Sequence, residues 1–391
     1  MAEASGASVV IVGGGATGLS AAFWLAREGV DVLVLDKGIV GWEASGRNGG
    51  GCSHHFSPLF AEEQRLWPQM DELLGYPTEF RANRVRVALD AGQMLLYGRA
   101  AHNAAAQGFR AEALDAAQVR GLVPLVGDTV HGGYLWHFGG HANPHRTLQA
   151  YGWATQDRGG RILQNTLVTA IRTAGGRAVA VETDRGSFAC DHLVLAAGPH
   201  TAPLAAMLGI DVPMVAARAE MIVTEPLPLM PIGGVDGNGL YGRQTLRGNL
   251  AYGGGPHEWL ELDGWTVPHR TSTPLMRNMA RRLAELFPKA AHARIIRSWA
   301  GIIENTPDGR PVIERLGDPA NVTVATLSSV GFGLSPATGR AIRDLVVDGA
   351  CGFADLSSFR LERFAALEPD WRELQGWVPQ PATLDRSATV A

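Results

Sequence analysis

Hydrophobic residues near the N-terminus occur in two short runs, separated by a glycine-rich turn and an alanine-rich segment. Residues 7–12 read Ala-Ser-Val-Val-Ile-Val, and residues 30–35 read Val-Asp-Val-Leu-Val-Leu. Runs of aliphatic and β-branched residues bounded by glycine are typical of strands buried in a parallel sheet. The alanine-rich segment between them favours a helix. The start of the chain therefore predicts a strand, a helix and a second strand.

Similar β-rich runs recur along the chain. Strands are predicted near 160–163, 167–172, 184–198 and 321–326. Further strands, at 84–89, 219–224 and 249–254, contain alternating or β-branched residues bounded by Gly and Pro, a pattern that favours an antiparallel sheet. A closing helix is expected from Ala337 to Val347, just after residues 331–335.

The turn between the first strand and the first helix has the spacing of a dinucleotide-binding motif. Gly13 permits the tight turn, Gly15 lets backbone approach a pyrophosphate, and Gly18 lets the helix pack close to the strand. The pyrophosphate is expected at the helix N-terminus, where free N–H groups and the positive end of the dipole favour an anion. Asp36 ends the second strand and is expected to accept hydrogen bonds from a ribose.

Composition and charge exclude several function classes. The 391 residues include 34 Lys and Arg against 38 Asp and Glu, without a basic stripe, so nucleic acid is not an expected partner. No apolar run reaches the ~18 residues of a membrane span, and the N-terminus lacks a basic-then-apolar signal pattern. Three scattered cysteines, Cys52, Cys190 and Cys351, do not make a disulfide framework, so the cytoplasm is the expected compartment.

Four further segments occur in a characteristic order. They are 184–201, which ends Leu-Ala-Ala-Gly-Pro-His-Thr, then Trp-Ala-Gly at 299–301, Asn-Thr-Pro-Asp-Gly-Arg-Pro-Val-Ile at 305–313, and Ser-Ser-Val-Gly-Phe-Gly-Leu-Ser-Pro at 328–336. Together with the N-terminal motif, these segments resemble the family of FAD-dependent amine and amino-acid oxidoreductases typified by D-amino-acid oxidase, glycine oxidase and sarcosine oxidase. The resemblance extends from about residue 8 to about residue 349 and is weakest in the middle.

The resemblance implies an α/β fold with a Rossmann-like FAD-binding domain and a second, mainly antiparallel-sheet substrate domain. The FAD-binding domain would be discontinuous and comprise residues 1–80, 140–210 and 296–375, and its second part would enter a helix within residues 141–148. The substrate-binding domain would comprise residues 81–139 and 211–295. Residues 379–391 are expected to form a flexible tail.

The resemblance also implies which residues hold FAD, and no metal is expected. The early loop 41–51 would wrap the pyrophosphate and the flavin ring, and the N-terminal end of the closing helix would face the flavin N1–C2=O edge. Attachment is expected to be non-covalent, because related proteins use a cysteine where this chain has Gly301-Ile302-Ile303, or a histidine where it has Asn48. The predicted FAD-binding residues are Gly13, Gly15, Ala16, Thr17, Gly18, Asp36, Lys37, Ser45, Gly46, Arg47, Asn48, Gly49, Gly50, Val168, Ala197, Gly198, Gly301, Gly331, Phe332, Gly333, Leu334 and Ser335.

Residues that would bind the substrate are less clear. Amino-acid-directed family members clamp a carboxylate with an arginine where this chain has Ile303, and sarcosine-directed members use a lysine where it has Gly333. Either the substrate lacks a carboxylate beside its amine, or another group holds it. The candidate pocket residues are Tyr241, Arg243, Arg218, His54, His55 and Glu304, the last of which would pair with an ammonium or form a surface ion pair.

The implied activity is oxidation of a small amine or amino acid by hydride transfer to flavin N5, giving an imine that hydrolyses. Electrons would then pass to O2 or to another acceptor. Rapid use of O2 through a lysine beside the flavin is disfavoured, because the only lysines are Lys37 and Lys289. Two alternatives stay open. The chain would be the flavoprotein subunit of a heteromeric amine or imino-acid dehydrogenase with a partner subunit, or an FAD-dependent monooxygenase, which would need NAD(P)H.

Overall fold

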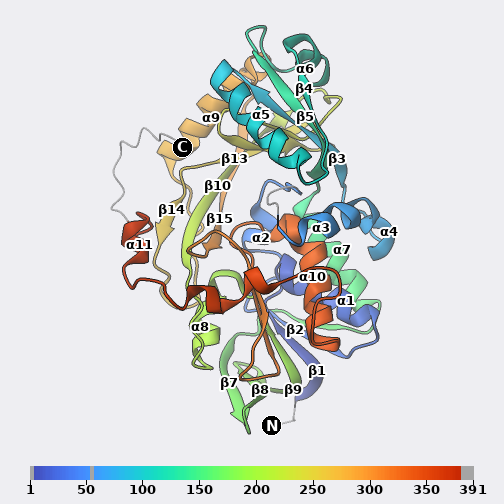
Figure 1. Ribbon diagram of the computed structural model, residues 1–391, viewed down its shortest axis with the longest axis vertical. Helices are drawn as coiled ribbons and strands as arrows, with labels where there is room; N and C mark the ends of the chain where they lie inside the picture. Colours follow the sequence, from blue (N-terminus) through green and yellow to red (C-terminus); the bar gives the residue numbers. More distant parts are fainter. Residues whose placement is uncertain (1–3, 53–56, 380–391) are drawn as a thin grey trace.

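The computed structural model describes residues 4–52 and 57–379, which form two β-sheets with helices packed on them (Figure 1). The lower half of the view holds the first sheet with α1 and α10, and the upper half holds β3, β4 and β5 with α5, α6 and α9. Strands β10 and β15 run between the two halves. This architecture confirms the predicted α/β class.

The first sheet has a parallel core of five strands in the order β17-β9-β1-β2-β6. Strand β16 pairs antiparallel with β17, and β7, β8 and β9 form an antiparallel meander. All four strands predicted for the middle and end of the chain exist. Because the core is parallel, the carboxyl ends of β1, β2 and β9 meet at one edge, where sheets of this kind bind ligands. The strands are β1 (Ala4–Val12), β2 (Val32–Leu35), β6 (Arg161–Leu163), β7 (Val168–Ala174), β8 (Arg177–Thr183), β9 (Gly186–Leu195), β16 (Val312–Arg315) and β17 (Val322–Thr326).

Helices α1 and α7 and the closing helix α10 pack together on one face of this sheet. Helix α7 begins as expected, because the Asn143 side chain accepts a hydrogen bond from Arg146 N and Pro144 occupies the first turn. The helices are α1 (Ala16–Arg27), α2 (Ala44–Arg47), α3 (Phe60–Leu66), α4 (Met70–Leu74), α5 (Ala91–Ala105), α6 (Ala116–Leu122), α7 (Pro144–Gln156), α8 (Thr201–Ala206), α9 (Thr273–Leu286), α10 (Gly331–Val347) and α11 (Trp371–Leu374).

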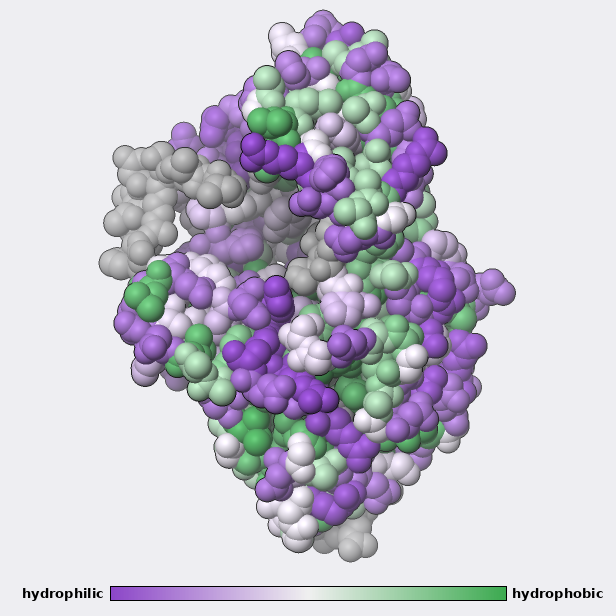
Figure 2. Space-filling model, in the orientation of Figure 1, coloured by the Kyte–Doolittle hydropathy of each residue, from purple (hydrophilic) through white to green (hydrophobic). Residues whose placement is uncertain are grey.

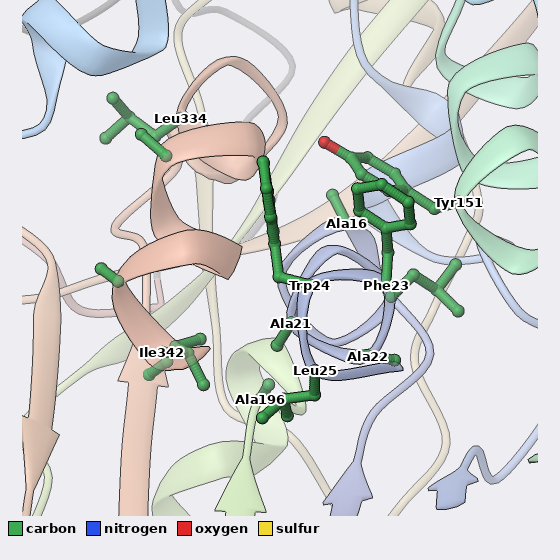
Figure 3. Close-up of a cluster of buried hydrophobic side chains, with 14 of the residues drawn as sticks. Ala16, Ala21, Ala22, Phe23, Trp24, Leu25, Tyr151, Ala196, Leu334 and Ile342 are labelled. Atoms are coloured by element: carbon green, nitrogen blue, oxygen red, sulfur yellow. The ribbon is translucent and has the colours of Figure 1, made fainter. Parts of the chain in front are cut away.

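The core of the first sheet is centred on α1, which is buried along almost its whole length (Figure 3). Trp24 extends from α1 toward α10, and its Nε1 donates to Pro336 O at 3.0 Å. Phe23 and Tyr151 place their rings together between α1 and α7, with centroids 6.1 Å apart. The predicted helix after the glycine turn is therefore the central helix of this core.

The closing helix begins earlier than the sequence predicted. Helix α10 starts at Gly331 rather than after Ser335, so the glycine-rich segment forms its first turns. Pro336 lies inside the helix and cannot donate to Phe332 O, but Ser335 Oγ donates to that carbonyl at 2.8 Å. Trp67 Nε1 donates to Gly333 O at 2.7 Å. These side-chain hydrogen bonds stabilise the first turns of α10. Local sequence rules would instead have the helix interrupted at Pro336.

The second sheet has the order β14-β10-β13-β12-β11-β3-β5-β4. Strand β15 lies off this order and also pairs with β10. The sheet is antiparallel except for the β3–β11 pair. The strands predicted at 84–89, 219–224 and 249–254 correspond to β3, β10 and β13. Its strands are β3 (Arg81–Ala88), β4 (Ala111–Leu114), β5 (Gly132–His141), β10 (Val215–Pro226), β11 (Val235–Gly237), β12 (Leu240–Gln244), β13 (Asn249–Gly254), β14 (Glu258–Leu260) and β15 (Ile295–Asn305).

Strand β15 connects the two sheets. The predicted domain boundary at residue 296 assigns nearly all of this strand to the first domain, yet it pairs with β10 from Ile295 to Asn305 in the second sheet. Its last residues then lead toward β16 of the first sheet. The division into two discontinuous domains stays a prediction, with β15 as the element that both would share.

The face of the molecule in Figure 2 is mostly hydrophilic, with hydrophobic residues in small groups. The large exposed hydrophobic side chains come from separate elements, among them Leu95 and Leu96 of α5, Trp153 of α7 and Leu374 of α11. Within residues 4–52 and 57–379, no helix has the combination of length and apolar character that crossing a membrane requires. The predicted flexible tail, residues 379–391, lies outside the described residues except for its first residue.

Candidate active site

The turn after β1 brings backbone very close to the start of α1. Gly13 has a φ of +113°, which residues with a side chain rarely adopt, and a Cβ there would lie 2.7 Å from Ala196 C. A Cβ on Gly18 would overlap the carbonyl of Gly13. Glycine is therefore needed at 13 by the turn and at 18 by the packing of α1 against it, as the motif predicted.

The N-terminus of α1 leaves backbone donors free. Within residues 4–52 and 57–379, the N–H groups of Gly15, Thr17 and Gly18 have no hydrogen-bond partner. Ala16 N is the exception, since it donates to Ser45 Oγ at 2.9 Å. Free N–H groups at the positive end of a twelve-residue helix form an anion site.

Asp36 lies beside this turn, at the carboxyl end of β2. Its Oδ2 accepts a hydrogen bond from Gly14 N at 2.7 Å, and its Oδ1 accepts one from Gly38 N at 2.8 Å. These two bonds hold the carboxylate in place, and each oxygen keeps a lone pair for another donor. Asp36 is therefore oriented for the ribose contact that the sequence predicted.

A cavity of about 1130 Å³, counted to its open mouth, extends from Asp36 along the carboxyl edge of the first sheet. We call it the first cavity. Most of the predicted FAD-binding residues line it, namely Gly13, Gly15, Ala16, Thr17, Asp36, Lys37, Ser45, Asn48, Val168, Ala197, Gly198, Gly331 and Phe332. Thr166, His200 and Trp265 also line it, although the sequence did not single them out.

The start of α10 forms another part of the first cavity's wall. The N–H groups of Gly331, Phe332 and Gly333 have no hydrogen-bond partner in the part of the chain that the structure describes. Gly331 and Phe332 line the cavity. The positive N-terminal end of α10 thus faces the cavity, where it would stabilise negative charge on a bound ligand.

Some predicted FAD-binding residues line no cavity and instead support those that do. A Cβ on Gly46 would overlap Gly41 O, and one on Gly50 would overlap Ala142 O. These glycines allow close backbone packing in the early loop. The others in this group are Gly18, Gly333, Leu334 and Ser335, which pack within α1 and α10.

A second cavity, of about 1470 Å³ counted to its mouth, lies against the second sheet. It shares five lining residues with the first cavity, namely Ala44, Asn48, Ile303, Ser329 and Phe332. The predicted residues Arg47, Gly49, Gly301 and Tyr241 line it. The two cavities therefore meet at a common wall formed by the early loop, the end of β15 and the start of α10.

Arg47 lines the second cavity rather than the first. Its Nε donates to Trp42 O at 2.6 Å, its Nη1 donates to Ala300 O at 3.0 Å, and its guanidinium lies 4.7 Å from the Trp42 ring centroid. Desolvation by burial lowers its pKa. The side chain ties the early loop to β15, and the predicted contact with the pyrophosphate remains an expectation.

Arg243 is buried behind the early loop. Its Nη1 donates to Gly49 O at 2.6 Å, and the side chain lines neither cavity. Burial lowers its pKa to about 10. The structure thus shows Arg243 holding the loop backbone, whereas the sequence proposed it as a substrate anchor. Arg218, another candidate anchor, pairs with Glu258 and Glu220.

Tyr241 and Glu304, both predicted pocket residues, lie in different cavities. Tyr241 lines the second cavity, and burial raises the pKa of its hydroxyl to about 12. Glu304 lines the first cavity, where its Oε1 accepts hydrogen bonds from Thr326 Oγ1 at 2.9 Å and Leu327 N at 3.0 Å. Burial raises the pKa of Glu304. The structure therefore does not bring Glu304 together with Tyr241.

The remaining candidates are histidines and the nearby cysteine. His54 and His55 lie outside the described residues. Cys52 is fully buried, its Sγ lies 3.4 Å from Gly50 O, and it lines neither cavity. No cysteine is among the described lining residues of the two cavities, and non-covalent binding of FAD stays a prediction.

Sequence reasoning missed several polar residues of the second cavity. Arg84 and Arg86 lie two apart on β3 and so share a face, opposite the buried Val85 and Val87. Arg84 is buried, and its Nε donates to Asp236 Oδ2 at 3.1 Å. The signal was present in the sequence, because arginines alternating with valines mark a strand with one apolar and one functional face.

His257 and Tyr97 complete the polar lining of this cavity. Burial lowers the pKa of His257 and raises that of Tyr97. Neither residue has a hydrogen-bonded side chain among the described residues. No sequence pattern marked them, because they come from a loop and from α5.

Comparison with known proteins gives a consistent result. The profile of the family described as "FAD dependent oxidoreductase" (DAO) matches residues 8–345. The chain is 30% identical over 372 residues to sarcosine oxidase subunit beta of Rhizobium meliloti (strain 1021), covering 91% of this chain and 88% of that protein. It is 27% identical to glycine oxidase of Geobacillus kaustophilus (strain HTA426), covering 91% of this chain and 96% of that protein.

Solved structures show the same fold. L-proline dehydrogenase from P. horikoshii superposes with a TM-score of 0.84 at 22% identity, covering 93% of this chain and 99% of that one. Glycine oxidase from Geobacillus kaustophilus superposes with a TM-score of 0.83 at 24% identity, covering 91% and 98%. With the glycine turn, the free helix donors and Asp36 around one cavity, these matches establish that the chain belongs to the DAO family of FAD-dependent oxidoreductases.

Proposed function

We propose that the protein oxidises a small amine or amino acid at the carbon beside its nitrogen, with FAD in the first cavity and the substrate in the second. The observation that carries this proposal is the shared wall, Ala44, Asn48, Ile303, Ser329 and Phe332. A cofactor lying along the first cavity would expose its reactive ring to the second cavity there. When bound, FAD supplies a hydride acceptor.

The protein's own residues have distinct parts in this proposal. Gly15, Thr17 and Gly18 offer N–H groups to the pyrophosphate, and Asp36 accepts from the ribose. The start of α10 stabilises negative charge at the wall between the cavities. Apolar residues of the second cavity, such as Met221 and Ile303, disfavour the ammonium form of the substrate by excluding water. The imine would leave the cavity and hydrolyse in water.

Anaerobic spectroscopy tests this proposal. The purified protein is expected to be yellow, and one of a panel of sarcosine, proline and hydroxyproline enantiomers, D-amino acids and polyamine conjugates should bleach the ~450 nm flavin band. Admitting O2 then separates an oxidase from a dehydrogenase. NADH and NADPH should leave the band unchanged, which disfavours a monooxygenase. A protein that binds no FAD, or a flavin that no amine bleaches, would contradict the proposal.

A second candidate is the flavoprotein subunit of a heteromeric enzyme. It is favoured by similarity over 91% of the chain to a protein named as a subunit, sarcosine oxidase subunit beta. Purification of a tagged chain tests whether untagged partner subunits co-purify with it. The rate of amine-driven dye reduction is then measured with and without those subunits. An isolated chain that turns over as fast as any complex would argue against a required partner.

The compartment and the domain division are proposed on the same basis. Cys52, Cys190 and Cys351 are unpaired, which suits a reducing cytoplasm. The FAD-binding domain would hold the first sheet and the substrate-binding domain the second, with β15 joining them. Cell fractionation tests the first proposal, and limited proteolysis between the sheets tests the second.

A further inference from the structure

We propose that Arg86 anchors a carboxylate at the far end of the second cavity, so that the substrate is an amine whose carboxylate lies several bonds from the carbon that is oxidised. The proposal rests on the proposed function and names the substrate class that the second cavity would take. It differs from the arrangement expected by resemblance, in which an anchor stands near Ile303 or Gly333, beside the reacting carbon.

Arg86 lines the second cavity with a guanidinium that has no hydrogen bond or ion pair within residues 4–52 and 57–379. The group lies 4.6 Å from the Trp136 ring centroid and 5.8 Å from that of Tyr97. Stacking on aromatic rings orients a guanidinium without using its N–H donors. The whole donor fork of Arg86 is thus held in position and available to a ligand.

Its neighbour Arg84 shows the contrast. Arg84 points to the same face of β3, but it pairs with Asp236 and donates to Gly140 O at 3.0 Å and Gly242 O at 3.2 Å. Each guanidinium nitrogen of Arg84 therefore donates to an oxygen of the protein, as expected of an arginine with a structural role. Arg86 could be replaced by an uncharged residue without breaking a bond to any described residue.

The charge of the second cavity favours an anion. Its charged lining residues, among those that the structure describes, are Arg47, Arg84, Arg86 and Asp236. Asp236 forms its ion pair with Arg84, and neither Arg47 nor Arg86 forms an ion pair in this part of the chain, although the Glu43 charge acts on Arg47. A carboxylate on Arg86 would be held by a bidentate, charge-assisted pair, and the nearby Tyr97 hydroxyl would add a donor.

The position of Arg86 sets the length of the substrate. In the early loop, Gly49 faces β12 of the second sheet, where a Cβ on Gly49 would lie 3.4 Å from Tyr241 Cδ2, and Gly51 bridges to His141 at the carboxyl end of β5. Strand β3 is two places beyond β12 in the sheet, or ~10 Å at the usual strand spacing. Trp136, over which the guanidinium lies, belongs to β5, one strand farther still. An α-carboxylate, one bond from the oxidised carbon, would not span this distance.

A chain-length series tests the inference. The probes are N-methylglycine, N-methyl-β-alanine, 4-(methylamino)butanoate and longer homologues, each with its methyl ester, and the readout is anaerobic flavin bleaching. We expect half-saturation to fall with chain length, and esters to bind poorly. Arg86→Met should raise half-saturation for the best acid about ten- to a hundredfold, as expected for loss of a charge-assisted pair, while leaving the ester unaffected. Arg86→Lys should be intermediate.

Arg110→Met is the matched control, because Arg110 is an exposed arginine that pairs with Glu112 and lines neither cavity. A preference for the shortest acid, or equal half-saturation in Arg86→Met and Arg110→Met, would overturn the inference. Calorimetric binding of hexanoate to the FAD-loaded protein provides a readout independent of turnover. If no amine bleaches the flavin, the proposed function fails. The role of Arg86 as an anchor is then decided by hexanoate alone. Binding to the wild type but not to Arg86→Met supports the anchor, and equal binding to both proteins overturns it.

Discussion

At the scale of single residues, identical arginine side chains differ in role because the fold surrounds them differently. Arg84 is neutralised by Asp236, Arg243 holds the carbonyl of Gly49, and Arg86 lies against aromatic rings. Burying a guanidinium is costly unless its donors are paired, so the two buried arginines are tied to partners. Of these three, only Arg86 keeps its donors for a ligand.

Gly15→Ala separates cofactor binding from folding. Gly15 has φ −82°, which alanine adopts without strain, so the variant should fold. The added Cβ would point toward Ser45 Oγ at 3.0 Å and occupy the space through which a pyrophosphate approaches the backbone. We expect FAD affinity to fall by about tenfold or more, measured by calorimetry on apoprotein. Gly317→Ala, where a Cβ meets nothing within 4 Å, is the control and should bind FAD normally.

Glu63 should make stability depend on pH. Its side chain is fully buried, and desolvation, opposed by a smaller effect of the Gln64 side chain, raises its pKa well above the ordinary 4.5. The folded state therefore binds this proton more tightly than the unfolded state. The contribution of Glu63 to the free energy of unfolding should therefore fall as pH rises from 4.5 to the raised pKa, by about 1.4 kcal/mol for each pH unit in that window, and it is isolated by comparing the wild type with a variant that lacks the carboxyl.

Urea unfolding at several pH values between about 5 and about 8 measures this effect. Glu63→Gln removes this titrating group, so its free energy of unfolding relative to the wild type should increase as pH rises through the window, while the other titrating groups act equally on both proteins. Glu72→Gln changes an exposed glutamate of the next helix and should leave the slope as it is. Parallel profiles for wild type and Glu63→Gln would show that the carboxyl is not responsible.

At the scale of elements, the crossing of α1 and α10 positions both helix N-termini on the first cavity. The two helices touch through small residues, since a Cβ on Gly339 would lie 2.5 Å from Ser20 C. Ser20 Oγ donates to Ser335 O at 2.7 Å across the same contact. The close approach brings the free N–H groups of Gly15 and Gly331 to the same cavity.

Gly339→Ala should separate the two helices. The added methyl group would overlap Ser20, and we expect a loss of about 1–3 kcal/mol in the free energy of unfolding together with weaker FAD binding. Gly121→Ala in α6 is a matched helical control, because a Cβ there meets nothing, and it should stabilise the protein by up to about 1 kcal/mol. Denaturant unfolding measures the stability of both variants. If Gly339→Ala were as stable as Gly121→Ala, the close contact between α1 and α10 at Gly339 would not be needed for stability.

At the scale of the whole molecule, the segment 261–272, which follows β14 of the second sheet, crosses to the first sheet. Lys37 Nζ donates to Trp265 O at 2.7 Å, and His269 Nε2 lies 3.1 Å from Glu43 Oε2. Trp265 lines the first cavity together with Lys37. This segment therefore closes the cavity with residues that are more than 200 positions away from the glycine turn.

Lys37→Met should weaken the coupling between this segment and FAD. A ligand at 100 times its Kd adds ~2.7 kcal/mol to stability, so FAD should raise the wild-type melting temperature by several degrees. We expect a smaller rise and faster FAD release in Lys37→Met, measured by thermal unfolding and by flavin fluorescence. Lys289→Met removes the other lysine, which is half-exposed beside Asp128, and should behave like the wild type. Equal FAD release from both variants would show that Lys37 does not retain the cofactor.

The sequence predicted those features that short-range physics decides. The strand, glycine turn and helix at Val9–Arg27 depend on backbone conformation and on hydrophobic periods of a few residues, and the structure has all three. The position of Asp36 follows from the end of β2. The start of α10 was misplaced, because Pro336 breaks local helix rules and the compensating donor, Trp67, is 266 residues away from Gly333.

By itself the sequence therefore determined the fold class, the glycine turn, the acid beside it and the family. Only the tertiary structure decided which arginine is free. Arg84 finds Asp236 across 152 residues and Arg243 finds Gly49 across 194, contacts that no local pattern encodes. The same holds for the common wall of the two cavities, which joins the early loop, β15 and α10. Partners so distant in sequence meet because sheet pairing and core packing act on the whole chain at once.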